Sequence, residues 1–158
     1  MDVDVGLTAE AGIVAWQEAL EDPRDALERI RVIMAEHIAE RFQSQSDPWG
    51  TLWAPWSPTT VAIRVHRGKD LVRGPFGARA RVTDGGRDLV IGFGRNPIPR
   101  YFHFGNPNNK VFGKGDGPIP ARPLLPITEA GVVLPSELHD AVMEAFREGI
   151  RDSVDEAR

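Results

Sequence analysis

The sequence predicts an α+β fold, in which a small, mostly antiparallel sheet packs against two long amphipathic helices and long Trp- and Gly/Pro-rich loops join them. Three observations support this. Apolar residues recur at helical spacing near both ends of the 158-residue chain. Between Asp47 and Pro126 lie 12 of the 16 glycines and 11 of the 13 prolines, which disfavours long helices there. Within that stretch, two short apolar runs flank a glycine turn. We expect one domain over 1–158, helical at 8–44, loop and hairpin at 45–128, and helical again at 134–155.

The first element predicted is a short strand, because Asp2 to Leu7 alternate polar and apolar residues. Thr8 can then cap a helix, which Gly12 weakens and Pro23 interrupts. Four residues of this helix share a face: Ala11, Val14, Ala15 and Ala19. We therefore expect the first helix to be short.

The strongest helix is predicted from about Arg24 to Gln43, with Asp22 as its cap. Its apolar residues recur at steps of three and four: Leu27, Ile30, Met34, Ile38 and Phe42. A second good helix begins near Pro135 and Ser136. Its apolar residues are spaced by four: Leu138, Val142, Phe146, Ile150 and Val154. Because a four-residue step drifts by about 40° on a helix, this stripe runs obliquely, which suits packing across a sheet.

The middle of the chain predicts strands. The runs at 80–83 and 88–92 flank the turn Asp84-Gly85-Gly86, and glycine supplies the positive φ that such a turn needs. These runs predict a β-hairpin. A further strand is expected at Leu124, Leu125 and Ile127.

Several classes of function are disfavoured by the residues present. The chain has no cysteine, which rules out disulfides, thiolate nucleophiles and Cys-type zinc sites. Its four histidines lack metal-ligand spacing, and no serine lies in a nucleophile elbow. The Gly-rich run at 113–117 lacks the Lys-Ser/Thr ending of a phosphate-binding loop. The pairs Glu36/Glu40 and Glu144/Glu148 stand at solvated helix positions. We expect no catalysis, no metal and no cofactor.

The sequence also predicts no membrane partner. No stretch approaches the roughly 18 consecutive apolar residues that a membrane span needs, and the first four residues include two aspartates where a secretory signal is basic. We expect the protein to be cytosolic at synthesis.

Charge is strongly segregated along the chain. The net charge is −7 over residues 1–47 (4 basic, 11 acidic), +8 over 48–128 (12 basic, 4 acidic) and −5 over 129–158 (3 basic, 8 acidic). The densest basic run comprises Arg64, Arg67, Lys69, Arg73, Arg79 and Arg81. One interpretation is contact with nucleic-acid phosphates. The other is charge complementarity between subunits, with the acidic ends of one copy facing this run in the next.

An aromatic cluster follows the strongest helix. Trp49, Trp53 and Trp56 are interleaved with prolines, so they cannot all point inward from one regular element. Trp is enriched at protein interfaces. Two readings stay open: an exposed interface, or one or two Trp residues covering the core beneath a long loop.

Three segments resemble the phage virion morphogenesis family, the tail completion proteins of long-tailed bacteriophages. The first is Arg41-Phe42 followed by the Trp-rich run at 47–60, in which Trp53-Ala54-Pro55-Trp56-Ser57 is similar to the family's Trp-x-Pro-Leu-Ser. The second is the run at 101–105, and the third is Ile119-Pro120-Ala121-Arg122-Pro123-Leu124-Leu125, close to the family's Ile-Pro-Ala-Arg-Pro-Phe-Leu. The resemblance covers about residues 20–150 in consistent order.

The resemblance implies a non-enzymatic structural protein at the head-tail junction of the virion, present in the host cytoplasm during assembly. It would cap the head-proximal end of the tail tube as a ring, commonly of six copies, with the tail tube protein and a head-tail connector or stopper protein as partners. The alternative is a head-side connector that contacts packaged DNA through residues 64–81. The interface candidates are Trp49, Trp53, Trp56, Arg64, Arg67, Arg73, Arg79, Arg81, Tyr101 and Arg122.

Arg122 carries a hypothesis of its own. Because Ala121 and Pro123 stiffen its backbone, its guanidinium is well placed for a fixed bidentate bond to a carboxylate. An exposed arginine at the start of a strand is the competing interpretation.

Overall fold

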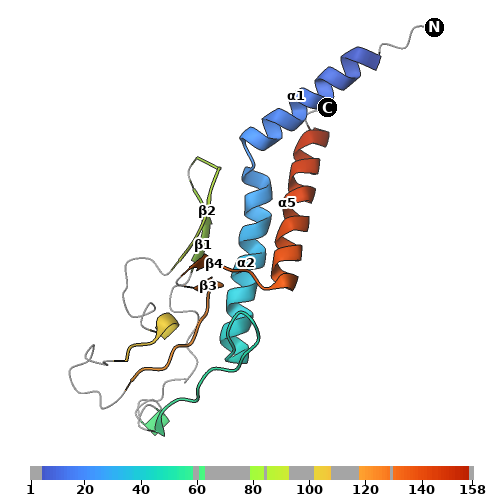
Figure 1. Ribbon diagram of the computed structural model, residues 1–158. Coiled ribbons are helices and arrows are strands. Elements are labelled where there is room, and N and C mark those ends of the chain that lie inside the picture. The colour runs from blue at the N-terminus through green and yellow to red at the C-terminus, as the bar shows by residue number, and fades with distance from the viewer. Residues whose placement is uncertain are drawn as a thin grey trace. The chain divides into compact units, whose positions relative to one another are not determined.

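The computed structural model describes residues 5–58, 61–62, 79–83, 85–92, 102–107, 118–128 and 130–156, and their side chains apart from 5–12 and 79 (Figure 1). The elements are α1 (Val5–Glu21), α2 (Arg24–Ser44), β1 (Arg79–Val82), β2 (Leu89–Gly92), β3 (Ile127–Thr128), β4 (Gly131–Val132) and α5 (Ser136–Glu156). The sheets are antiparallel and two-stranded, so the fold is α+β, as the sequence predicts. Two separate small sheets, β1-β2 and β3-β4, take the place of the single sheet expected.

Contacts divide the chain into two compact units. The first unit comprises Met1–Met34, Ala80–Val90 and Ser136–Arg158. The second comprises Ala35–Arg79 and Ile91–Pro135. Helix α2 contributes residues to both, and the prediction of one domain over 1–158 stays a prediction.

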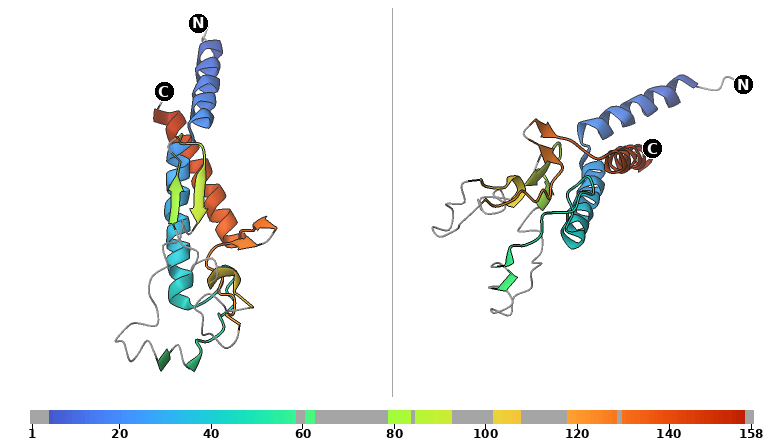
Figure 2. Two further views of the ribbon diagram at one scale, coloured as in Figure 1. Left: turned by 90° about the vertical axis from the view of Figure 1, so that its left-hand side faces the viewer. Right: turned by 60° about the horizontal axis from the view of Figure 1, so that its bottom comes forward.

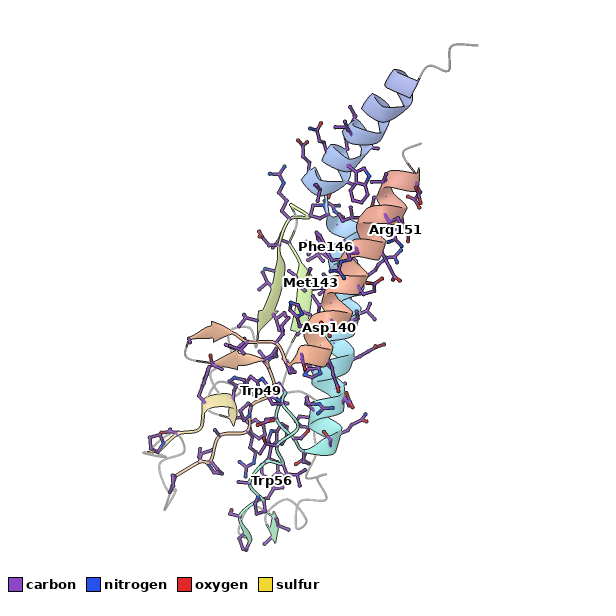
Figure 3. All side chains as sticks on the ribbon, turned by 45° about the vertical axis from the view of Figure 1, so that its right-hand side comes forward. Trp49, Trp56, Asp140, Met143, Phe146 and Arg151 are labelled. Atoms are coloured by element: carbon purple, nitrogen blue, oxygen red, sulfur yellow. The ribbon has the colours of Figure 1, made fainter. Side chains whose placement is uncertain are left out.

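The first unit is held by close packing of helices. Its buried cluster consists of Ala15, Ala19, Ala26, Ile150 and Val154. Phe146 of α5, labelled in Figure 3, packs against this cluster. These are mostly small side chains, so the helix backbones approach closely. A Cβ built on Gly149 of α5 would lie 2.5 Å from the Ala26 Cα of α2, which makes glycine the residue that this crossing requires. Arg29 of α2 adds exposed ion pairs with Glu148 and Asp152 of α5.

Helix α1 differs from the prediction at its start. The strand expected from Asp2 to Leu7 is wrong over Val5–Leu7, because α1 already begins at Val5. A short alternating run needs a neighbouring strand to pair with, whereas a helix closes its hydrogen bonds within itself. The helix runs for 17 residues through Gly12 and is longer than expected. Ala15 and Ala19 are buried as predicted, but Val14 is 49% exposed.

Helices α2 and α5 confirm their predictions to within one or two residues. Most of the predicted α2 stripe is buried: Ile30, Met34, Ile38 and Phe42. In α5 the buried side is Leu138, Ala145, Gly149, Ile150 and Val154. Both predictions succeed because helical spacing of apolar residues is a local signal.

The β1-β2 hairpin also confirms its prediction (Figure 2). Thr83 donates its N–H to the Asp88 carbonyl at 2.9 Å, and Gly86 donates to the Thr83 carbonyl at 2.8 Å. Gly86 takes a φ of 69°, the positive value expected of this turn.

The second unit surrounds an aromatic core. Its buried cluster is Ile38, Phe42, Trp53, Phe102, Leu124 and Leu125, with Trp56, Ile91 and Ile127 packed against it. In the β3-β4 pair, Ile127 lies opposite Val132 and Thr128 opposite Gly131. The strand predicted at Leu124 and Leu125 is wrong, because β3 begins only at Ile127. The two leucines are buried in irregular backbone whose N–H groups face a histidine side chain instead of a strand.

None of the helices in the part of the chain that the structure describes contains an apolar stretch sufficient to span a bilayer.

Candidate interface at the tryptophan loop

The three segments that carry the family resemblance meet in the second unit. The residues at 47–58, here called the tryptophan loop, begin three residues after the end of α2 at Ser44. Phe102 and His103 come from the second segment, and Arg122 to Leu125 from the third. Contacts between residues 20 to 70 positions apart hold them together.

Asp47 organises the start of the tryptophan loop. Its Oδ1 accepts the N–H of Trp49 at 2.9 Å and of Thr51 at 2.8 Å. Its own N–H donates to the Thr51 carbonyl at 2.8 Å. Asp is suited to this position because its short carboxylate accepts hydrogen bonds from backbone N–H groups just after it. The loop therefore leaves α2 as a tight, hydrogen-bonded turn.

Trp53 anchors the loop to the core. It is 8% exposed, and its Nε1 donates to the Pro123 carbonyl at 3.0 Å. Its ring stands edge-on to Phe42 and Phe102, at centroid distances of 6.0 and 5.4 Å. Edge-to-face rings at these distances attract beyond the effect of burial alone.

Arg122 fastens the middle of the loop. Its Nε donates to the Ala54 carbonyl at 3.2 Å and its Nη2 to the Pro55 carbonyl at 3.1 Å. The guanidinium carbon lies 4.5 Å from the Trp56 ring centroid, within the range of a cation–π interaction. The side chain is 4% exposed, and burial lowers the pKa of Arg122, although a guanidinium stays charged at any ordinary pH.

This geometry corrects both interpretations of Arg122. The fixed two-pronged bond is present, but its acceptors are two successive backbone carbonyls and not a carboxylate. The alternative, an exposed arginine at the start of a strand, is wrong because the side chain is buried. Arg122 therefore fixes the backbone of the tryptophan loop at Ala54 and Pro55.

The second and third segments are paired through their backbones. Asn106 and Ile119 exchange hydrogen bonds of 2.9 and 2.8 Å, and Arg122 N–H donates to the Phe102 carbonyl at 2.8 Å. Gly105 has a φ of 74°, and a Cβ there would lie 2.8 Å from the Ile119 carbonyl oxygen. Only glycine fits both the conformation and the space, which accounts for its place in the 101–105 run.

His103 joins these segments from within the core. Its Nδ1 accepts the Leu124 N–H at 3.1 Å, and its Nε2 lies 3.1 Å from the Ile127 carbonyl. Because a backbone N–H can only donate and a carbonyl can only accept, the ring is neutral with its proton on Nε2. Burial lowers the pKa of His103.

We expect the folded state to lose stability as the pH falls below the usual histidine pKa of 6.5, because the unfolded chain then binds a proton that folded His103 refuses. The loss ends at the lowered pKa of the folded state. His37, whose pKa burial and Arg41 lower, contributes in the same direction. Urea unfolding from pH 8 to 5 measures the effect. His103→Gln and His37→Gln should each flatten the pH dependence, and an unchanged slope in both variants would contradict the assignment.

The outer side of the tryptophan loop is exposed, apolar and uncharged. Leu52 is 75% exposed and Trp49 is 43% exposed. No charged residue occurs from Pro48 to Pro58, in a chain of which 27% is charged. An ordered apolar surface of this kind is suited to contact with another protein.

The structure separates the three tryptophans. Trp53 is buried and Trp56 half-buried, so these two cover the core, while Trp49 remains exposed. The interface reading therefore fits Trp49, and the core reading fits the other two. Arg81 is exposed on β1. Arg64, Arg67, Lys69, Arg73 and Tyr101 lie outside the described residues, as does the side chain of Arg79.

Sequence reasoning missed two features of this region. Leu52 is more exposed than the tryptophans of the loop, and nothing in its sequence context distinguishes it from a core leucine. His103 is buried, a position that neither its lack of metal-ligand spacing nor its place in the 101–105 run predicts. The described residues contain no group of His, Cys, Asp or Glu that could hold a metal ion.

Comparison with known proteins gives one match. The model of the phage virion morphogenesis family matches residues 10–146, which is most of the chain. Neither a curated protein sequence nor a solved structure matches the chain significantly. Family membership indicates a structural part in phage assembly and association with the virion. The three converging segments and this match lead to one conclusion: the chain belongs to the phage virion morphogenesis family.

Proposed function

We propose that the protein is a structural component of the phage neck that completes or caps the head-proximal end of the tail tube and enables the head to join it. It would act as a ring, with six copies as the expected number, and by protein–protein contact without a cofactor. The family match over residues 10–146 carries the proposal.

The tryptophan loop supports this function with a suitable docking surface. Trp49 and Leu52 are exposed on a loop that Asp47 and Arg122 hold in one conformation. A rigid loop loses little conformational entropy on binding, so its apolar side chains contribute more of their burial energy to affinity. We assign this surface to the tail tube protein, whose end must be recognised by shape in every virion.

Deleting the gene from its phage tests the function. We expect negative-stain electron microscopy to show filled heads separate from tails, with tails of irregular length. Complementation with Leu52→Glu should fail to restore joining, whereas Val132→Glu, which replaces a 66% exposed apolar residue on β4, should restore it. Normal infectious virions after the deletion would contradict the proposed function.

The alternative function is a connector that binds DNA, and binding assays with the purified protein test it. The proposal predicts that the purified protein binds isolated tail tubes and has no affinity for duplex DNA. DNA binding that weakens steeply with salt would instead favour the basic run from Arg64 to Arg81 as a phosphate contact.

A further inference from the structure

Helix α1 carries an exposed apolar stripe in addition to the side that packs in the first unit. Ile13, Trp16 and Leu20 are 59%, 46% and 57% exposed. At 100° per residue they lie within about 60° of one another, so they form one continuous face. Ala15 and Ala19 are buried on a different side of the helix, in the cluster with Ile150 and Val154 of α5. The stripe is therefore not needed for the contacts that hold α1 in its unit.

The charges of α1 argue against pairing of the stripe with the same stripe of another copy. The helix contains three acidic residues, Glu10, Glu18 and Glu21, and no basic residue. Glu18 and Glu21 are exposed. Glu21 lies about 100° from Leu20, at the border of the stripe, whereas Glu18 lies about 160° from Leu20, on the opposite side of the helix. Two α1 helices paired in parallel through this stripe would bring the Glu21 carboxylates of both copies to the same end of the contact, which is unfavourable. The stripe fits an apolar surface with a basic border.

The β1-β2 hairpin in the same unit offers such a surface. Val90 on β2 is 44% exposed, and Arg81 on β1 is exposed, while their neighbours along each strand are half-buried. Arg81 and Val90 thus belong to the outward side of the hairpin, and Arg87 in its turn is exposed as well. Because the α1 stripe and this hairpin side are both exposed in one protomer, they do not cover each other.

We propose that the exposed stripe of α1, Ile13, Trp16 and Leu20, docks on the outward side of the β1-β2 hairpin of a second copy of the chain. Glu21 then faces the hairpin arginines, and the apolar side chains cover Val90. Two different surfaces meet in this contact, so it repeats from copy to copy and can close into a ring. Its place in a tail cap rests on the proposed function, but the contact is tested without that assumption.

The absence of cysteine allows a direct test by single-cysteine crosslinking. Leu20→Cys and Val90→Cys are made in chains of different tag length, mixed and oxidised. We expect a disulfide that joins the two variants. Glu18→Cys is the matched control, because Glu18 is also exposed on α1, lies two residues from Leu20 and is about 160° away from it on the opposite side of the helix; it should give no such product with Val90→Cys. The reaction is run on concentrated purified protein and on tails from cells that produce both variants.

The crosslinking products distinguish docking of α1 on the hairpin from pairing of two α1 helices. A mixed disulfide in either sample supports the heterologous contact. Disulfides of Leu20→Cys chains only with one another would replace it by paired α1 helices, and no mixed product in either sample would overturn it.

Charge reversal gives a second readout. Glu21→Arg and Arg81→Glu should each weaken the association between copies by roughly tenfold, measured by sedimentation velocity or by the yield of mixed disulfide. Combining both changes in one chain should restore most of the association. Failure of the combination to recover would count against facing charges.

Experiments in the phage that carries the gene distinguish failure of the α1 contact from failure of the proposed function. If the gene deletion leaves heads and tails unjoined but Leu20→Lys restores infectious virions, the function stands and the α1 contact is wrong. If the deletion leaves normal virions while the mixed disulfide forms, the contact stands and the tail-cap function is wrong.

Discussion

Arg122→Met is expected to lower the free energy of unfolding by about 2–4 kcal/mol, because it removes two hydrogen bonds from a charged donor and a cation–π contact. The lost partners are the Ala54 and Pro55 carbonyls and the Trp56 ring. Ala54 and Pro55 are exposed, so water can reach their carbonyls once the guanidinium is removed. The loss of unfolding free energy is therefore smaller than for two fully buried carbonyls. Urea unfolding measures the change.

Two further variants show whether stability depends on the planar guanidinium, which donates to both carbonyls at once. Arg122→Lys keeps the charge but cannot donate to both carbonyls in one plane, so it should lose a large part of the same stability. Arg147→Met is the control, because that guanidinium is 60% exposed and pairs only at 3.5 Å with Glu144 among the described residues. Wild-type stability in Arg122→Lys would show that charge alone, and not the pair of carbonyl bonds, holds the loop.

Gly149→Leu is expected to cost about 3 kcal/mol or more, since even the first carbon of a side chain would lie 2.5 Å from the Ala26 Cα. Helix propensity works the other way, because replacing glycine inside α5 by a better helix former gains up to about 1 kcal/mol. We expect the steric term to win, since the opposing atom is backbone and cannot turn aside. Thermal and urea unfolding measure the difference.

The matched variants use the same two helices. Ala141→Leu, at an exposed position of α5, should change the unfolding free energy by about 0.5 kcal/mol or less. Gly149→Ala should destabilise, and Ala26→Gly added to it should recover part of the loss by making room. A stabilising Gly149→Ala would mean that the helices cross with more space than the structure gives them.

The elements that sequence predicted well are those with local signals. Apolar spacing along α2 and α5 and the glycine turn of the β1-β2 hairpin each depend on residues within a few positions of one another. Helix α1 is predicted only in part, because the alternation from Asp2 to Leu7 favours a strand and Gly12 favours a short helix, whereas the helix begins at Val5 and continues through Gly12. Ile13, Trp16 and Leu20 have helical spacing too, and a count of both stripes would have found them.

The candidate site was predicted in its residues but not in its contacts. The aromatic run and Arg122 were singled out from sequence, and the structure brings both into the second unit. The roles of these residues differ from the predicted ones, because the burial of each side chain depends on its contacts with distant segments of the chain. Trp53 points to Pro123 and is buried, whereas Trp49, four residues earlier, is exposed on the same loop.

The α+β class, the two long helices at their observed places, the hairpin and the family all follow from spacing and motifs that can be read along the chain. The groups that these residues contact follow only from the folded arrangement. The bond of Arg122 to Pro55 spans 67 residues, and that of His103 to Leu124 spans 21. A sequence shows that Arg122 is a donor but does not show which group accepts its hydrogen bonds. The acceptors are backbone carbonyls, which every residue carries. Only folding brings a particular donor and carbonyl within hydrogen-bonding distance.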